Sequence, residues 1–146
     1  MRSLEILVTQ WTKENVAPLP PVSASVVSET FARLNAVATS DILYLYSLMG
    51  GMENMTGDLW RHWSMDEILA ENIEPSEFGV LFADYLISSW CYRAKAKLDN
   101  TSAVYVDHFD EKAPILVADS LEEFFDHYLK SSGEALHNHY RPNNDA

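Results

Sequence analysis

The sequence contains a single cysteine, no long apolar run and few basic residues. Cys91 is the one thiol among 146 residues, so neither an internal disulfide nor a metal site made of several cysteines is available to one chain. The apolar stretches fall far short of the roughly 20 residues that cross a bilayer. Near the N-terminus, Glu5 stands where the apolar block of a signal peptide would begin. We therefore expect a cytoplasmic protein without membrane contact.

Basic residues are outnumbered by acidic ones, with 10 Lys and Arg against 22 Asp and Glu and a formal net charge of −12. Direct binding of nucleic acid is not expected, because phosphates are neutralised by clustered positive charge. Segment 64–92 has six acids and no Lys or Arg, and segment 98–129 has eight acids against Lys112 alone. These runs serve either ordinary solubility or an acidic face that attracts a basic partner protein.

Helical periodicity dominates the first third of the chain. A helix over residues 3–15 is predicted by apolar residues spaced at i, i+3, i+4 and i+7, namely Leu4, Leu7, Val8 and Trp11. Three prolines then predict an extended connector over 16–23. A second helix is expected over 25–34. A third should begin with Ser40 as its N-cap and end at Gly50-Gly51, where glycine supplies a left-handed stop.

The middle of the chain changes to strand-like segments separated by turns. Residues 58–63 predict a short strand or edge segment, and the capping-box spacing of Ser64 and Glu67 predicts a short helix to about residue 72. Further strands are expected over 78–83, 86–97, 103–109 and 114–118. Ser120 and Glu123 form a second capping box before a strongly periodic helix.

This order of elements predicts an α+β fold. An antiparallel sheet meander should be flanked by N-terminal helices and by one C-terminal helix. We expect one domain over residues 1–133, followed by a polar, flexible tail over 134–146.

Motifs that carry chemistry are few. The chain lacks GxGxxG, Walker-type, HExxH and GxSxG strings. Cys91 would be a nucleophile only if His108 or His127 lay beside it, and its place within a predicted strand favours a packed side chain. His137 and His139 are the nearest approach to a metal pair, but no further ligand stands at a fixed spacing. We predict no catalytic residues, no metal and no cofactor.

Two other groups of residues have alternative interpretations. Arg93, Lys95 and Lys97 share one face of a predicted strand, where they either receive a phosphate or protect the edge of a sheet. Trp60 and Trp63 either line a binding groove or pack in the core beneath the following helix. We favour edge protection for the cations and core packing for the tryptophans.

Three short motifs resemble a known family. Residues 42–51 (ILYLYSLMGG) look like a helix ending in Gly-Gly, residues 63–68 (WSMDEI) like a short capped helix, and residues 115–125 (ILVADSLEEFF) like a closing strand, cap and final helix. Their order and spacing resemble the SUKH superfamily, which includes the fungal Smi/Knr cell-wall-synthesis regulators and many bacterial toxin-immunity proteins. The resemblance covers about residues 25–130, so the first helix and the proline connector are additions to it.

The SUKH resemblance implies a non-enzymatic domain that binds a protein partner, commonly a cognate toxin that it blocks stoichiometrically. A nuclease toxin would have a basic groove, so an acidic inhibitor would compete with the phosphate backbone for it. The candidate partner-binding residues come from the two acidic runs: Glu71, Glu74, Glu77, Asp107, Asp110 and Glu111.

Two alternatives to the immunity function stay open. One is a regulatory or scaffolding module whose partner is not a toxin. The other is a small enzyme or ligand carrier with an aromatic-lined pocket near Trp60, Trp63, Trp90 and Tyr92.

Overall fold

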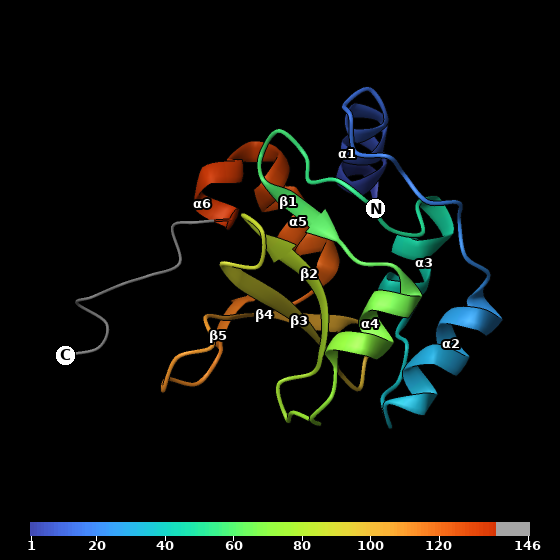
Figure 1. The fold of residues 1–146 in the computed structure, drawn as a ribbon, viewed down its shortest axis with the longest axis vertical. Coiled ribbons are helices and arrows are strands. Elements are labelled where there is room, and N and C mark those ends of the chain that lie inside the picture. The colour runs from blue at the N-terminus through green and yellow to red at the C-terminus, as the bar shows by residue number, and fades with distance from the viewer. Residues whose placement is uncertain (137–146) are drawn as a thin grey trace.

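The computed structural model describes residues 1–136, which form one five-stranded sheet with helices packed around it (Figure 1). The predicted histidine pair, His137 and His139, lies outside the described residues. Every strand pairs antiparallel with the next one along the chain. In order these are β1 (Trp60–His62), β2 (Val80–Tyr85), β3 (Trp90–Ala96), β4 (Ser102–Asp107) and β5 (Ile115–Ala118). The predicted antiparallel meander is confirmed.

Helices precede, interrupt and follow the sheet. They are α1 (Arg2–Thr12), α2 (Ala24–Arg33), α3 (Ser40–Leu48), α4 (Met65–Glu71), α5 (Leu121–Lys130) and α6 (Ser132–Leu136). Both predicted capping boxes begin their helices as expected, because the Ser64 and Ser120 hydroxyls accept hydrogen bonds from the backbone N–H groups three residues later. The α+β class follows from these elements.

One face of the sheet is apolar and packs against α5, which lies behind β1 and β2 in Figure 1. Trp60 of β1 and Tyr92 of β3 contact Phe124 of α5, with ring centroids 5.5 and 5.4 Å away. Trp11 of α1 packs edge-on against Phe125 on the same helix. Burying rings of this size supplies most of the hydrophobic stabilisation of such a core.

The other face of the sheet carries charged side chains. Arg61 lies opposite Asp84, Asp84 opposite Cys91, and Cys91 opposite Asp107. Residues directly opposite one another in an antiparallel pair project to the same side, so these four side chains form a row across β1 to β4. We call this side the polar sheet face.

Two predicted element boundaries are wrong in detail. The strand expected over 86–97 begins at Trp90, because Leu86, Ile87 and Ser88 have φ values of 50°, 52° and 61° and form the hairpin turn. Helix α3 begins after Thr39 rather than after Ser40.

Gly50 does not supply the predicted left-handed stop. Helix α3 ends at Leu48, and Met49 after it is extended. A Cβ atom on Gly50 would lie 2.1 Å from the carbonyl oxygen of Pro20. The position therefore requires glycine because the proline connector passes against it.

The start of the predicted tail is also wrong. Residues 134–136 belong to α6, and Ala135 and Leu136 are buried. The carbonyl oxygen of Leu136 accepts hydrogen bonds from the Trp90 indole at 3.0 Å and from the Tyr92 hydroxyl at 2.9 Å. The polar groups of two aromatic residues of β3, the partly buried Trp90 and the buried Tyr92, thus bind a carbonyl oxygen in a segment whose sequence has no apolar period.

Candidate functional site

The six acids predicted to bind a partner do not form one surface. Glu71, Glu74 and Glu77 are exposed at the end of α4 and in the loop before β2. Asp110 and Glu111 are exposed in the loop between β4 and β5. The first loop enters β2 at Val80, which pairs with Ala94, whereas the second leaves β4 at Asp107, which pairs with Cys91. The two groups therefore lie at opposite ends of β3.

Asp107 is not available to a partner, which corrects the prediction for this residue. Its side chain is buried, and one carboxylate oxygen accepts a 2.9 Å hydrogen bond from Arg93 Nε. The other oxygen accepts from the backbone N–H of Phe109 at 2.8 Å. The sequence placed Asp107 in an acidic run, but only the β3–β4 register brings Arg93 beside it.

The basic residues of β3 and its turn are bound within the fold. Besides its contact with Asp107, Arg93 donates to the carbonyl oxygen of Gly79 at 2.9 Å. Lys97 Nζ donates to the carbonyl oxygen of Asp119 at 2.7 Å, and Lys95 Nζ lies 6.0 Å from the Phe78 ring centre. Each cation has an internal partner, so this arrangement favours a structural role over a phosphate site.

Arg61 is the centre of a second charged cluster on the polar sheet face. Its guanidinium binds both carboxylate oxygens of Glu67, at 2.8 and 2.6 Å. It also donates to Asp84 Oδ2 at 2.9 Å, and the Trp63 indole N–H donates to that same oxygen at 2.6 Å. Hydrogen bonds to Glu67 and the nearby charge of Asp84 raise the pKa of Arg61. The guanidinium is therefore a fixed cation in this cluster.

A depression of about 520 Å³ opens beside this cluster. Its lining residues come from the segment after α1, the loop before β1, strands β1 and β2 and the β2–β3 turn: Asn15, Glu53, Asn54, Met55, Arg61, Asp84, Ile87 and Ser88. Although Asp84 is buried, its Oδ1 atom has no hydrogen-bond partner among residues 1–136. A buried carboxylate oxygen without a donor is costly, but this atom has almost no accessible surface, so a ligand in the depression would not reach it directly.

The β2–β3 turn that borders the depression is strained. Leu86, Ile87 and Ser88 are three consecutive residues with positive φ, a conformation that costs a β-branched residue such as Ile87 roughly 1–2 kcal/mol. Ile87 is also 79% exposed. The turn thus holds an apolar side chain at the rim of the depression at a conformational cost.

Sequence reasoning did not predict the pairing of Arg61 with Asp84. Alternation within β1 and β2 places Arg61 and Asp84 on definite faces, but the pairing of the strands decides that they meet. The acidic run 64–92 included Glu67 and Asp84 as surface charge, whereas both neutralise Arg61 in the fold.

Cys91 lies next to this cluster and is buried. Burial, together with the negative charge of Asp84, raises the pKa of the Cys91 thiol to about 12, so it is protonated at neutral pH. His108 packs against the ring of Trp90, whose side chain projects to the opposite face from Cys91, and His127 contacts Glu134 at 3.3 Å. These surroundings favour a packed side chain over a nucleophile at Cys91.

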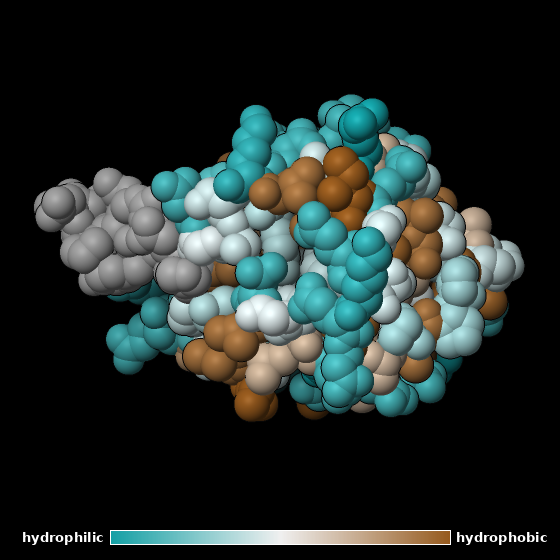
Figure 2. Space-filling view, turned by 90° about the horizontal axis from the view of Figure 1, so that it is seen from above, coloured by the Kyte–Doolittle hydropathy of each residue, from teal (hydrophilic) through white to brown (hydrophobic). Residues whose placement is uncertain are grey.

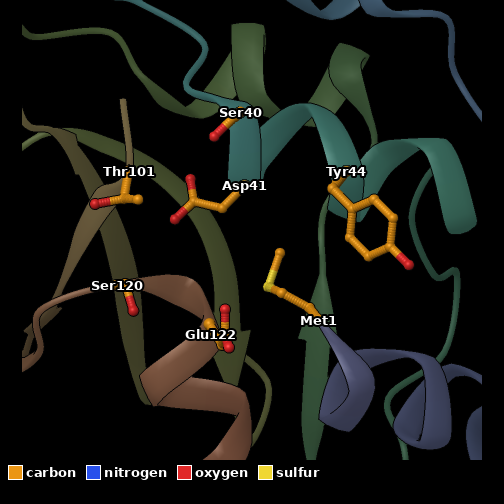
Figure 3. A pocket seen from close by; sticks show the side chains of 7 residues that line it. All are labelled: Met1, Ser40, Asp41, Tyr44, Thr101, Ser120 and Glu122. Atoms are coloured by element: carbon orange, nitrogen blue, oxygen red, sulfur yellow. The ribbon is translucent and has the colours of Figure 1, made fainter. Parts of the chain in front are cut away.

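A second hollow, of about 240 Å³, lies between α1, α3 and the start of α5 (Figure 3). The carboxylate of Asp41 points into this junction (Figure 3). Its Oδ1 accepts from the Thr39 hydroxyl at 2.6 Å and from the Ile42 N–H at 2.9 Å. Its Oδ2 accepts from the backbone N–H groups of Ser102 at 3.0 Å and Leu121 at 3.2 Å. Both oxygens are used to join α3, β4 and α5.

The aromatic residues of the pocket considered as an alternative pack within the fold. Trp60, Trp63 and Tyr92 are at most 1% exposed. Trp90 is stacked on Tyr85 with ring centroids 4.8 Å apart. The preferred interpretation of Trp60 and Trp63 as core residues is confirmed.

Residues 1–136 hold no cluster of three or more His, Cys, Asp or Glu side chains suited to a metal ion. Across that same range, each helix is too short or too polar to span a bilayer. A scan against protein-family models and a search of curated proteins find no match to this chain. The SUKH resemblance therefore rests on its three sequence motifs.

Proposed function

We propose that this chain is a non-enzymatic, SUKH-type protein-binding domain, most simply an immunity protein that neutralises a basic toxin by stoichiometric binding. The observation that carries the proposal is an unequal distribution of charge. Arg61 and Arg93, the cations that flank the acidic run, are paired with the buried carboxylates of Asp84 and Asp107. They cannot offset the exposed acids between them.

The exposed part of this run is the surface that we propose for docking. Glu71, Glu74 and Glu77 surround Ile73, whose side chain is 85% exposed. Protein interfaces commonly combine an apolar anchor with a charged rim that selects the partner and speeds its approach. In Figure 1 the loop after α4 lies at the lower end of the molecule, near the loop that follows α2. Arg33 and Glu74 line one depression there, so one cation is also present.

The opposite end of the molecule has a different surface. Figure 2, which views the molecule from above, shows hydrophilic residues over most of the visible face and apolar residues in small separate groups.

The test starts with affinity capture of the tagged chain from its native cells, elution by a salt gradient and identification by mass spectrometry. The captured protein is then purified, and its affinity is measured by calorimetry at low and high salt. We expect a 1:1 complex with a basic protein, weakened by salt, and loss of the toxin's activity in that complex.

A charge-reversed variant assigns the surface. The triple change Glu71→Lys, Glu74→Lys and Glu77→Lys should weaken binding at least tenfold, which is about 1.4 kcal/mol. A matched control reverses Glu122, Glu123 and Glu134, which are also exposed and change the net charge equally. If both triple variants lose the same affinity for the partner, the effect is due to net charge and not to this surface. If the first triple variant binds with unchanged affinity at low salt, the electrostatic part of the proposal is contradicted. Reversal of Asp110 and Glu111 tests the other end of β3.

The same capture separates the remaining alternatives. Several host proteins, or one that resists salt, would favour a regulatory scaffold held by apolar contacts. A small enzyme or ligand carrier with an aromatic-lined pocket is the weaker alternative, because Trp60, Trp63 and Tyr92 pack inside the fold. Failure to capture any protein would redirect the search to small molecules.

A further inference from the structure

Three strongly exposed aliphatic side chains come from separate connections at one end of the molecule. Val37 lies between α2 and α3, Ile73 between α4 and β2, and Leu98 in the β3–β4 hairpin, and each is more than half exposed. The Ser40 hydroxyl donates to the carbonyl oxygen of Asn100 at 2.7 Å, which holds the hairpin against the start of α3. Apolar surface left in water gives up the stabilisation that burial would supply.

These three side chains share one surface. Val37 and Leu98 line the same shallow hollow. Ala36, the neighbour of Val37, lines a depression of about 270 Å³ together with Ile73. The α2–α3 loop thus contributes to both hollows, and we call the surface around Val37, Ile73 and Leu98 the loop-end surface. Neighbouring exposed apolar residues of this kind are typical of a protein interface.

The charges of the loop-end surface are balanced, unlike those of the whole chain. Segments 33–37, 72–79 and 95–99 carry as many cations as acids, namely Arg33, Lys95, Lys97, Glu74, Glu77 and Asp99. The whole chain has 10 Lys and Arg against 22 Asp and Glu. A surface of one sign repels its own copy, whereas a surface that carries both signs can be complementary to itself. This balance favours a second copy of the chain as the occupant.

Arg33 and Glu74 supply a pair of opposite charges for such an association. Both line the same depression as Ile73, and both are exposed. Within residues 1–136 neither the guanidinium of Arg33 nor the carboxylate of Glu74 has a hydrogen bond or an ion pair. In a two-fold symmetric interface every contact occurs twice. One Arg–Glu contact between two copies therefore gives two ion pairs.

We infer that two copies of this chain associate about a two-fold axis through the loop-end surface. Val37, Ile73 and Leu98 lie at the centre of the interface, and Arg33 of each copy pairs with Glu74 of the other. Apolar burial supplies the affinity, and the charged pairs fix the orientation. The inference goes beyond the proposed function, but the dimer uses Ile73 and Glu74 of the proposed docking surface. A partner that docks there would displace the second copy.

Sedimentation velocity of the full chain, without any partner protein, tests the inference. The chain concentration is raised from about 1 μM to about 1 mM, a range that covers weak dimers, at about 0.15 M salt. We expect a shift from monomer to dimer within this range. Ile73→Ser and Leu98→Ser should each weaken dimerisation about tenfold or more. The matched control is Ile87→Ser, because Ile87 is similarly exposed at the other end of β2, and it should dimerise like the wild type.

Charge variants test the orientation of the two copies. Arg33→Glu and Glu74→Arg should each weaken dimerisation about tenfold, because each variant places like charges opposite one another twice. An equimolar mixture of these two variants should dimerise like the wild type, since both Arg–Glu contacts form again between the unlike chains. Glu123→Arg on α5 changes the net charge as much as Glu74→Arg does, and it should leave dimerisation unchanged.

The outcomes separate this inference from the proposed function. A chain that stays monomeric up to about 1 mM would overturn the inference. So would a dimer that both Ile73→Ser and Leu98→Ser leave intact, or a mixture of the two charge variants that stays monomeric. None of these results involves the partner, so the immunity function would stand. A captured partner that binds the intact dimer would instead count against the α4–β2 loop as its docking surface.

Discussion

Asp41 and Asp84 are both buried carboxylates, yet their oxygen atoms are used differently. Asp41 has two donors on each oxygen, three of them backbone N–H groups. Asp84 has two side-chain donors on Oδ2 and none from residues 1–136 on Oδ1. Asp41 is therefore a structural joint that uses both of its oxygens, whereas donors of the described residues hold only one oxygen of Asp84.

The position of each carboxylate explains the difference. Asp41 stands in the first turn of α3, where β4 and the N-terminus of α5 also converge. Helix N-termini have free N–H groups, so donors are plentiful there. Asp84 lies within β2, whose backbone donors are used by neighbouring strands. Its partners must be side chains, and within the described part of the chain these are Arg61 and Trp63.

The largest effect is expected for Asp41→Asn. An amide has one acceptor oxygen, so its NH₂ group would face either the Ser102 and Leu121 N–H groups or the Thr39 and Ile42 donors. Unpaired buried donors cost about 1–3 kcal/mol each, so we expect a loss of about 4 kcal/mol in unfolding free energy. Urea unfolding measures it. A loss below about 1 kcal/mol would show that Asp41 is not a structural joint.

His62 extends the comparison to a buried group that titrates. Its Nε2 is 3.0 Å from the carbonyl oxygen of Met49, and its Nδ1 has no partner among residues 1–136. Burial lowers the pKa of His62 from its usual 6.5 to about 4 in the folded chain. The unfolded chain therefore takes up this proton first, and stability falls as pH drops from about 6.5 to about 4.

The expected loss from His62 is about 3 kcal/mol across this range, since one pKa unit corresponds to about 1.4 kcal/mol. His62→Gln keeps a donor for Met49 but does not titrate, so its stability should depend less on pH. Urea unfolding of both proteins at several pH values measures the difference. Replacing His127, which is half exposed, is the control. Parallel pH profiles for wild type and His62→Gln would contradict the assignment.

Asp84→Asn should cost much less than Asp41→Asn, about 1–2 kcal/mol. Its amide oxygen can take the place of Oδ2 and accept from Trp63 and Arg61. Its NH₂ group then replaces an oxygen that had no donor among residues 1–136, and Glu67 still neutralises Arg61. Urea unfolding of the two Asn variants side by side measures the contrast. Equal losses of unfolding free energy in the two variants would show that Asp41 and Asp84 contribute equally to stability.

The smallest effect is expected for Ser120→Ala. Its hydroxyl accepts from the Glu123 N–H at 3.0 Å, and loss of such a cap usually costs about 1 kcal/mol. Asp41 would still accept from the adjacent Leu121 N–H, so α5 should keep its start. Thermal unfolding compares this variant with Ser64→Ala, which removes the equivalent cap of α4. A much larger loss at Ser120 would show that the two acceptors act together.

Local sequence patterns predicted the elements well, because their signals are local. Capping boxes at Ser64 and Ser120 and the apolar period of α1 depend on residues within a few positions of one another. The predicted sites depend on residues far apart in sequence. Asp107 illustrates this, since its placement in an acidic run suggested a surface charge and the β3–β4 register made it the partner of Arg93.

By itself, the sequence determined the order of helices and strands, the antiparallel meander and the excess of negative charge. The tertiary structure decided which charges are neutralised and which face outward. It paired Arg61 with Asp84 across two strands, turned residues 86–88 into a strained rim, and docked residues 134–136 on β3. The physical reason is the separation in sequence of the residues that interact. Periodicity and capping involve residues within one or two helical turns, whereas burial and ion pairing involve segments that only folding brings together.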